Sequence, residues 1–338
     1  MTRTRVPFAG AAALLAAGAL ALAGCGTTES PEETNAGGGD TDGATSAAPA
    51  GPVTYTDERG EHTLDAPAED VVALEWGLTE NLLALGVEPI GQADVKGYNT
   101  WNTSAPLDPD TEDVGMRGEP SLSAITALEP DLIVTTTDVP ANVIDQLEEI
   151  APVLAMRGSA SEDPLGYMRK TVETLAVATG TEDRAEELLA EFDAKLEEGR
   201  RAVEEAGLAG EPFVMADGWL SGGTVSIRMY TPGSFFGAIG EELGMVNAWT
   251  EGGDPDYGLA QTDVEGLTEI GPAQFFYIAN DTEGGDAFTE GLADNPIWQQ
   301  LPFVQEGTVH RLPDGIWMFG GPLSAAAYID AIVEAISG

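Results

Sequence analysis

Residues 71–137 constrain the fold most strongly, because strand patterns and helix patterns alternate there in a regular order. A β-branched run, Val71 and Val72, leads into leucines at helical spacing at 78–85, and a leucine-spaced helix at 121–128 leads into a second apolar run, Leu132 to Val134. Strands are expected near 71–75 and 131–135. This alternation is typical of parallel sheets with crossover helices. The sequence therefore predicts an α/β fold. Further strands are expected at 89–92 and 152–155, and a further helix at 140–150.

Large aromatic side chains and one arginine stand outside this periodicity. Trp76, Tyr98, Trp101 and Arg117 follow strands or lie in loops, where open parallel sheets present the groups that bind ligands. A tryptophan taken alone is more often a core residue. Three aromatics and an arginine at strand-end loops together favour a binding site.

The amino terminus predicts the location of the protein. Arg3 and Arg5 precede an uninterrupted run of small and apolar residues from Phe8 to Ala23, and LAGC follows with the chain's sole cysteine, Cys25. This arrangement resembles a bacterial lipoprotein signal. The resemblance implies cleavage after residue 24 and a diacylglycerol on the Cys25 sulfur, which would anchor the protein on the extracytoplasmic face of the cell membrane. An uncleaved anchor is the alternative. A membrane-spanning helix, however, needs about 20 apolar residues, and the run from Phe8 to Ala23 is shorter.

Composition separates a tether from a folded part. Residues 26–51 contain no large apolar side chain, so a flexible linker is expected, while residues 52–338 are long enough for two lobes. The chain holds 14 Lys and Arg against 58 Asp and Glu, a net charge of -44, and removal of residues 1–24, with two arginines and no acid, makes it -46. Such a surface repels nucleic acid. With its only cysteine assigned to lipid, the chain is expected to form no disulfide.

The folded part divides into three predicted segments. Lobe one, 52–163, opens with a hairpin whose turn runs from Asp57 to Gly60. The helical segment, 164–207, breaks near Gly180 and restarts with Thr181 as N-cap, and its second helix, ending near 206, would be roughly 40 Å long. Lobe two, 208–338, begins with the strand PFVMADGW.

A duplicated module links the two lobes. The stretch from Leu267 to Asn280 echoes the stretch from Ile125 to Thr137: each has a helix end, a proline, two further residues and then a buried strand. Duplication at this distance indicates two similar α/β lobes that face one another. A ligand would then lie in the cleft between them.

Several motifs together resemble a known family. They are VVALEWGLTENLLALG, YNTW, DVGMRGEP, the NAW at 247–249, and NPIWQQLPFVQEGTVHRLPDGIWMFGGPLSAA. From about Val53 to the end, the chain resembles the periplasmic iron-siderophore binding proteins of ABC importers, closest to the ferrichrome and hydroxamate binders. The resemblance implies two Rossmann-like lobes joined by one long interdomain helix. It also implies a ferric siderophore as ligand, no cofactor and no metal held directly by the protein.

The resemblance carries over to individual residues. Trp76 and Trp101 match aromatics that line the cleft, and Arg117 matches the arginine that hydrogen-bonds the iron-chelating oxygens, a task that suits a guanidinium fork. The alternative for Arg117 is a surface salt bridge with Glu119. Phe319 stands where the family has a tyrosine, which removes a hydroxyl. The remaining candidates are Tyr257, Trp317 and Met318 in lobe two, together with Tyr98, Trp219 and Arg228.

The resemblance further implies docking on a permease dimer that works with ATPase subunits. In the family, one acidic side chain on each lobe pairs with permease arginines. Glu265 matches the lobe-two position; Glu119 and Asp145 both remain possible in lobe one, and Ser123 occupies one place where relatives carry Glu. A monomer is expected.

Other functions are disfavoured by the residues that are missing. A protein that binds a metal ion directly would need several clustered ligands, and the chain's two histidines, His62 and His310, lie far apart in sequence. No nucleophile-elbow or phosphate-loop motif indicates an enzyme. Cobalamin, haem, ferric citrate and catecholate siderophores remain rival ligands. The cleft offers few arginines for an anionic catecholate, namely Arg117, Arg228 and Arg157, which favours a near-neutral trihydroxamate.

Overall fold

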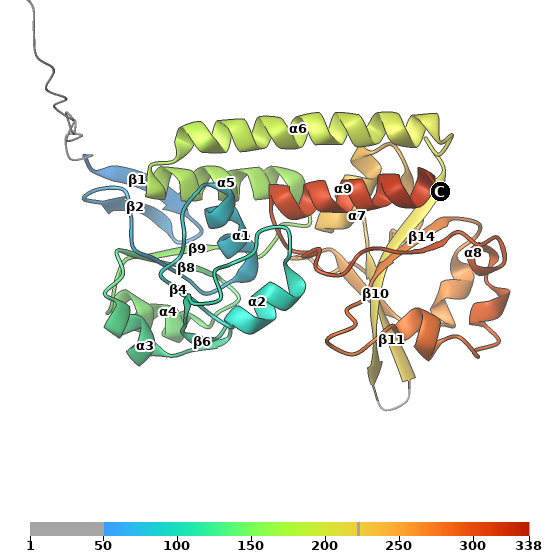
Figure 1. Ribbon diagram of the computed structural model, residues 1–338, viewed down its shortest axis with the longest axis horizontal. Coiled ribbons are helices and arrows are strands. Elements are labelled where there is room, and N and C mark those ends of the chain that lie inside the picture. Colours follow the sequence, from blue (N-terminus) through green and yellow to red (C-terminus); the bar gives the residue numbers. More distant parts are fainter. Residues whose placement is uncertain (1–50, 222–223, 338) are drawn as a thin grey trace, which may run out of the picture. The chain divides into compact units, whose positions relative to one another are not determined.

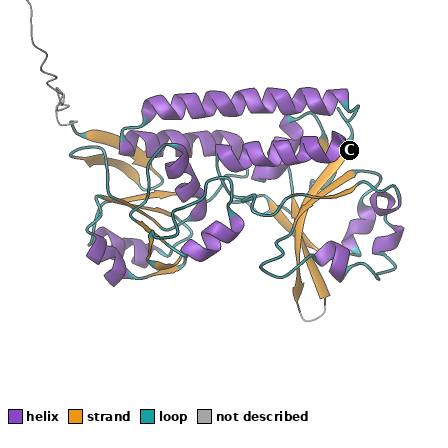
Figure 2. Cartoon of the chain, in the orientation of Figure 1, coloured by secondary structure: helices purple, strands orange, loops and turns teal. Residues whose placement is uncertain are grey.

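Two α/β lobes lie side by side beneath a layer of long helices (Figure 1). The structure is a computed structural model that describes residues 51–221 and 224–337. Figure 2 shows strands in the interior of each lobe with helices around them. The predicted fold class, two α/β lobes joined by a long helix, is confirmed.

Lobe one is built on a five-stranded sheet in which all neighbouring strands are parallel. Its central strands β3 and β8 are buried along their whole length, as expected where helices cover both faces of a parallel sheet. The strand order is β5 (Glu112–Asp113), β4 (Gly91–Gln92), β3 (Val71–Ala73), β8 (Leu132–Thr136) and β9 (Val153–Met156). The helices are α1 (Trp76–Ala84), α2 (Val95–Trp101), α3 (Leu122–Leu128) and α4 (Ala141–Glu148).

Two small hairpins complete lobe one. β1 (Val53–Asp57) pairs with β2 (Gly60–Leu64) through the predicted turn. Asp57 accepts hydrogen bonds from the Arg59 and Gly60 amides in that turn and from the amide of Ala155 in β9, so one buried carboxylate fastens the hairpin to the sheet. β6 (Gly115–Met116) pairs with β7 (Glu119–Pro120).

Lobe two has a mixed sheet rather than a purely parallel one. β10 runs parallel to β14 but antiparallel to β11, which forms a long hairpin with it. The order is β13 (Leu259–Thr262), β11 (Thr224–Tyr230), β10 (Pro212–Ser221), β14 (Gln274–Ile278) and β15 (Val309–Arg311), with β12 (Val246–Asn247) also paired to β10. The helical elements are α7 (Phe235–Glu242), η1 (Gly266–Glu269), η2 (Ala287–Gly291), η3 (Trp298–Gln300), α8 (Pro302–Gln305) and α9 (Pro322–Ser337).

The duplicated module appears in both lobes with one difference. In lobe one, α3 ends at Glu129, which adopts a left-handed conformation (φ 50°), and Pro130 prevents the helix from continuing into β8. In lobe two, the element before Pro272 and β14 is the 3₁₀ helix η1 instead of an α-helix. The repeat therefore preserves the proline and the buried strand.

The helical layer is continuous over both lobes (Figure 1). α5 (Pro164–Thr179) ends at Gly180 in a left-handed conformation (φ 69°), and α6 (Glu182–Glu205) then extends over 24 residues, about 36 Å. Thr181 holds the N-cap position, but its side chain makes no capping hydrogen bond. The first-turn acids Glu182 and Asp183 complement the helix dipole instead.

α6 packs against α5 on the side of lobe one and against α9 on the side of lobe two. Its buried stripe includes Leu188, Phe192 and Leu196, which join one apolar core that draws residues from both lobes. At Gly199 the helices approach closely, because an added Cβ would lie 2.6 Å from Ile329 of α9. The interdomain helix thus shares its core with both lobes.

A buried carboxylate links the two lobes below this layer. Glu80 in α1 is fully buried and accepts hydrogen bonds from the Gly321 amide (2.8 Å), the Ser324 amide (2.8 Å), the Ser324 hydroxyl (2.6 Å) and Asn102 Nδ2 (2.7 Å). Two of these donors belong to the first turn of α9, where the helix dipole favours a negative charge. Glu80 therefore joins α1, the end of α2 and the start of α9.

No helix within 51–221 and 224–337 combines the length and the apolar character that crossing a bilayer requires.

Replacing Glu80 with Ala should lower the free energy of unfolding by at least about 2 kcal/mol, because several buried donors lose their acceptor at once. Urea denaturation followed by far-UV circular dichroism would measure the loss. Glu88→Gln is the matched control, since Glu88 is exposed and lies just beyond the same helix. Equal midpoints for the two variants would contradict the linking role of Glu80.

Candidate functional site

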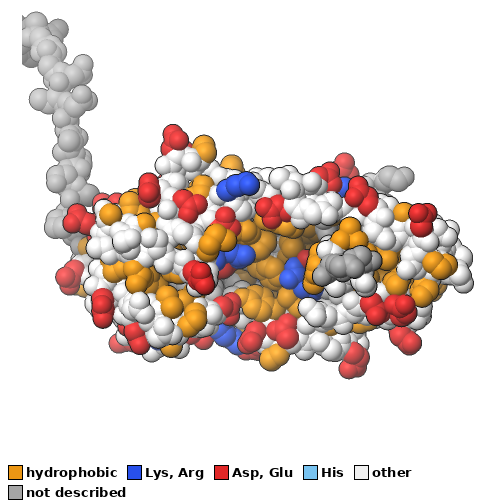
Figure 3. Space-filling model, turned by 90° about the horizontal axis from the view of Figure 1, so that it is seen from below, with side chains coloured by type: hydrophobic (Ala, Val, Ile, Leu, Met, Phe, Trp, Pro, Cys, Tyr) orange, Lys and Arg blue, Asp and Glu red, His pale blue; other side chains and the backbone are white. Residues whose placement is uncertain are grey.

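A cavity of about 960 Å³ opens between the two lobes. Figure 3 shows this hollow from the side opposite the helical layer, with apolar side chains on its floor, basic side chains on its two sides and acidic side chains around its mouth. Both lobes supply its lining. The volume is at the upper end of the range common for small-molecule sites, about 300–1,000 Å³.

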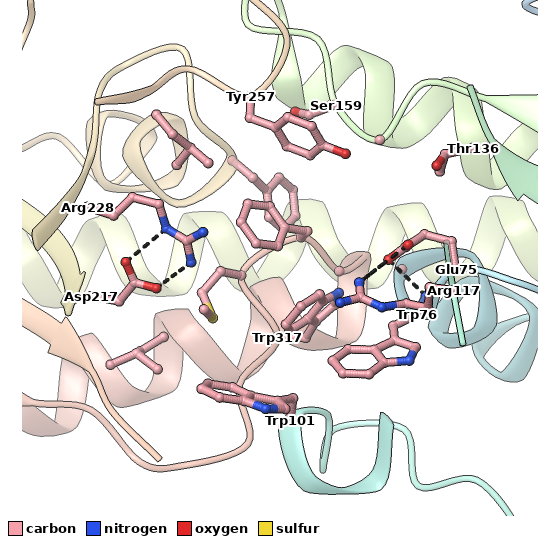
Figure 4. A pocket seen from close by; sticks show the side chains of 18 of the residues that line it. Glu75, Trp76, Trp101, Arg117, Thr136, Ser159, Asp217, Arg228, Tyr257 and Trp317 are labelled. Carbon is pink, nitrogen blue, oxygen red and sulfur yellow. Dashed lines mark hydrogen bonds and ion pairs between the residues drawn. The ribbon is translucent and has the colours of Figure 1, made fainter. Parts of the chain in front are cut away.

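The floor of the cavity is a row of aromatic rings in mutual contact. Trp76 meets Trp317 edge to face with ring centroids 4.8 Å apart, and Trp101 lies 6.4 Å from Trp317. Phe319 lies 5.2 Å from Trp317 and 5.4 Å from Tyr257. Edge-to-face packing of this kind fixes ring orientations. The row presents an apolar surface that joins the two lobes (Figure 4).

Local structure explains how the tryptophans are placed. Trp76 begins α1 directly after β3, and its Nε1 donates to the Ala93 carbonyl at 3.2 Å. Trp101 ends α2, and its Nε1 donates to Glu283 at 3.3 Å. Trp317 is buried, and its Nε1 has no hydrogen-bond partner within the described ranges.

Arg117 reaches the cavity from the turn between β6 and β7. Its Nη1 lies 3.0 Å from Glu75 Oε1, and its guanidinium carbon lies 3.9 Å from the Trp76 ring centroid. Burial raises the pKa of Glu75, an effect that the charge of Arg117 opposes. The predicted alternative, a salt bridge between Arg117 and Glu119, is wrong, because the carboxylate partner of Arg117 is Glu75.

Arg228 lines the cavity from strand β11 of lobe two. It lies opposite Asp217 in the register of β11 and β10, and Arg228 Nε lies 2.9 Å from Asp217 Oδ1, with a second bond from Nη2 (Figure 4). Burial raises the pKa of Asp217, again opposed by its arginine. The guanidinium carbon lies 5.3 Å from the Phe319 ring and 6.0 Å from the Trp219 ring. Each lobe therefore contributes an arginine that is held by an acid and lies close to aromatic rings, and lobe one adds Arg157, which pairs with Glu162.

Polar contacts between the lobes flank the aromatic row. The Tyr257 hydroxyl of lobe two donates to Asp138 of lobe one, and Asn280 Nδ2 donates to the Thr100 carbonyl at 3.0 Å. Burial, followed by the hydrogen bond to Asp138, raises the pKa of the Tyr257 hydroxyl, so this group stays a donor at neutral pH. These hydrogen bonds connect lobe one to lobe two on either side of the aromatic row.

The structure brings most of the predicted site residues together. Glu75 and Asp217, which hold the two arginines, were not predicted, since nothing in their local sequence marks them. The residues predicted at the site that do line the cavity are Trp76, Trp101, Arg117, Trp219, Arg228, Tyr257, Trp317, Met318 and Phe319.

Tyr98 is a correction. It does not line the cavity; its side chain is fully buried, and its hydroxyl donates to the Ala105 carbonyl at 2.6 Å. The loop after α2 covers this side of the helix, which sequence periodicity does not reveal.

The remaining predicted residues lie elsewhere. Glu119, Asp145 and Glu265 are exposed and do not line the cavity, while Cys25 falls outside the described residues. Of the histidines, His62 pairs with Asp57 and His310 with Gln274. Across 51–221 and 224–337 there is no group of three or more potential metal-ligating side chains.

Comparison with known proteins identifies relatives of the same kind. A profile described as periplasmic binding protein matches residues 71–315. The iron(3+)-hydroxamate-binding protein FhuD of Escherichia coli is 28% identical over 271 residues, covering 79% of this chain and 87% of that protein. The Fe(3+)-citrate-binding protein YfmC of Bacillus subtilis is 29% identical over 270 residues, covering 77% and 78%. The crystal structure of the Fe3+-Desferal-bound siderophore-binding protein FhuD from Vibrio cholerae has a TM-score of 0.69 at 26% identity, covering 79% of this chain and 97% of that one.

The Tyr98→Phe variant should lose about 1 kcal/mol of unfolding free energy, because it removes a buried hydrogen bond and leaves the Ala105 carbonyl without its donor. Equilibrium urea unfolding checks this. Tyr55→Phe is the matched control, since the hydroxyl of buried Tyr55 lies 3.5 Å from its acceptor and a smaller loss is expected. A larger loss for the control would contradict the structural role of Tyr98.

Proposed function

The chain belongs to the periplasmic binding protein family, and we propose that it is the extracytoplasmic substrate-binding component of an ABC importer that captures a ferric siderophore of the hydroxamate type and delivers it to the permease. The observation that carries the proposal is the aromatic row with one acid-held arginine on each side. The names of the relatives in the comparisons support iron chelates as the ligand class.

The geometry supports a chelate better than a bare ion. Oxygens that bind Fe(III) keep partial negative charge, and a guanidinium offers several donors in fixed geometry to such oxygens. Arg117 and Arg228 line the cavity from opposite lobes, so both can reach one ligand. The organic shell of a siderophore would rest on Trp76, Trp317 and Phe319.

The hydroxamate assignment rests on charge. Ferric catecholates are strongly anionic and favour several unbalanced cations, whereas Arg117 is paired with Glu75 and Arg228 with Asp217. A ferric trihydroxamate is near neutral and asks for little compensating charge. Ferric citrate, catecholates, haem and cobalamin are the alternative ligands, and an enzyme is the remote alternative.

We further propose that the diacylglycerol-modified Cys25 anchors the protein to the cell membrane and that residues 26–51 act as its tether. Acids on each lobe would pair with arginines of the permease dimer. Glu265 is the candidate in lobe two, and Glu119 and Asp145 are the candidates in lobe one; all three are exposed. The protein itself performs no reaction, and ATP hydrolysis in the partner subunits drives transport.

Ferric desferrioxamine B and ferrichrome should quench the tryptophan fluorescence, because Trp76, Trp101 and Trp317 would meet an iron-centred absorber. Arg117→Ala should raise the dissociation constant about tenfold or more, since a hydrogen bond to a charged group contributes about 1.5–3 kcal/mol and 1.4 kcal/mol is a factor of ten. Arg200→Ala is the matched control, because Arg200 lies on α6, pairs with Glu197 and with Glu242 of α7, and does not line the cavity.

Results that differ from these expectations would each change a specific part of the proposal. Quenching by haem or cobalamin but by no ferric hydroxamate would replace the ligand class. Unchanged affinity in Arg117→Ala would remove that residue from the site. Mass spectrometry of the recovered ligand should find it unaltered, and a converted product would favour the enzyme.

Charge reversal at the proposed docking site should separate binding from transport. Glu265→Arg should leave the dissociation constant for ferric desferrioxamine B unchanged but strongly lower uptake of the ⁵⁵Fe-labelled complex, because like charges would face each other at the permease. Glu269→Arg, an exposed acid in the adjacent η1, is the control. Full uptake with Glu265→Arg would remove Glu265 from the interface.

A further inference from the structure

The charges that line the cavity do not balance. Five carboxylates and three guanidinium groups lie among its lining residues. Glu75 and Asp217 hold Arg117 and Arg228, and Arg157 pairs with Glu162. Each cationic group is therefore already compensated by a carboxylate of the protein itself, while acids remain.

Three of the lining acids, Asp94, Asp138 and Glu283, have no compensating cation among the described residues. Asp94 caps α2, where it accepts from the Gly97 amide, which leaves Asp138 and Glu283. Both side chains line the cavity and belong to exposed residues. Within the described residues, no Lys or Arg nitrogen lies within 4.0 Å of either carboxylate. Their partners are neutral donors: the Tyr257 hydroxyl and, at 3.4 Å, Thr136 Oγ1 for Asp138, and Trp101 Nε1 for Glu283.

The two carboxylates lie in reciprocal positions. Asp138 comes from lobe one and accepts from an aromatic residue of lobe two, while Glu283 comes from lobe two and accepts from an aromatic residue of lobe one. Tyr257 and Trp101 are the end members of the series of rings that runs through Phe319 and Trp317, while Trp76 contacts Trp317 from the side. A negative charge therefore stands at each end of the surface on which the ligand would rest.

We propose that the cleft selects ferric hydroxamates that carry a positive charge, and that Asp138 and Glu283 bind the ligand's ammonium group. The inference rests on the proposed function and names the charge class of its ligand. A chelate core of near-neutral charge would occupy the aromatic row between Arg117 and Arg228. A pendant amine, protonated at neutral pH, would extend to one of the two rim carboxylates.

The net negative charge of the whole protein also favours positively charged ferric hydroxamates. With 58 acids against 14 bases, the surface attracts cations and repels anionic chelates before they reach the cleft. A general field acts on every cation alike and weakens with salt. The rim carboxylates add a local contact, so their contribution can be separated from that of the remaining acids by substitution.

The test compares two ligands that differ by one charge. Ferric desferrioxamine B ends in a primary amine, and its N-acetylated form has the same ferric chelate without the ammonium. Fluorescence titration should give a dissociation constant about 1.4- to fivefold lower for the amine form, in line with about 0.2–1 kcal/mol for an exposed ion pair. The difference should shrink in 0.5 M NaCl, where the screening length falls to a few ångströms.

The variant Asp138→Asn/Glu283→Gln should bring the two dissociation constants together. Both substitutions keep an oxygen that can accept from Tyr257 or Trp101, so the contacts between the lobes are retained while the charges are removed. The control is Asp183→Asn/Glu186→Gln, which removes the same charge from exposed positions on α6 and should preserve the preference for the amine form.

Equal affinity of the wild-type protein for the two ligands would overturn the inference and leave the proposed function standing. A preference that survives in Asp138→Asn/Glu283→Gln would also overturn it, because the general field would then be the cause. Failure of both ligands and of ferrichrome to bind would instead overturn the hydroxamate assignment in the proposed function.

Discussion

The arrangement of the cleft depends on one buried carboxylate. Glu80 accepts hydrogen bonds from α1's neighbours in both lobes, namely Asn102 at the end of α2 and the first turn of α9. The aromatic floor is drawn from these same segments: Trp76 begins α1, Trp101 ends α2, and Trp317 lies shortly before α9. Burial raises the pKa of Glu80, and the hydrogen bonds from Ser324, Gly321 and Asn102 oppose that shift. The carboxylate connects three segments of chain that no sequence motif links.

Carboxylates also position the arginines that line the cavity from each lobe. A guanidinium on a long side chain samples many rotamers, and ordering it on binding costs free energy. Glu75 holds Arg117 over the Trp76 ring, and Asp217 holds Arg228 near Phe319. Both arginines are therefore oriented before a ligand arrives. The acids that orient them also cancel their charge, so the contacts that preorganise the site also underlie the ligand charge that we propose.

The sequence predicts what is local and periodic, and misses what depends on contacts across the fold. Alternating strands and helices, Gly180 and Pro130 at helix ends, and the leucine spacing of α6 were enough to predict two lobes and the long helix. Glu75 was missed because its partner, Arg117, lies 42 residues further along the chain. Asp217 was missed because its partner, Arg228, lies on the neighbouring strand β11. Glu119 was the alternative partner considered for Arg117, yet Arg117 lies in the β6–β7 turn and pairs with Glu75 instead. Tyr98 follows a strand as Trp76 does, but a later loop covers it.

The uninterrupted helix α6 limits how far the ligand-bound and ligand-free forms of the protein can differ. This helix is about 36 Å long and contributes to a core shared by both lobes. It resists a large rotation of one lobe against the other, because such a rotation would bend the helix or expose its buried apolar residues. On the proposed function, ligand-bound and ligand-free forms would then differ at the edge of the cleft rather than by wide closure of the lobes. Release of the ligand would require the partner permease to separate two lobes that α6 holds together.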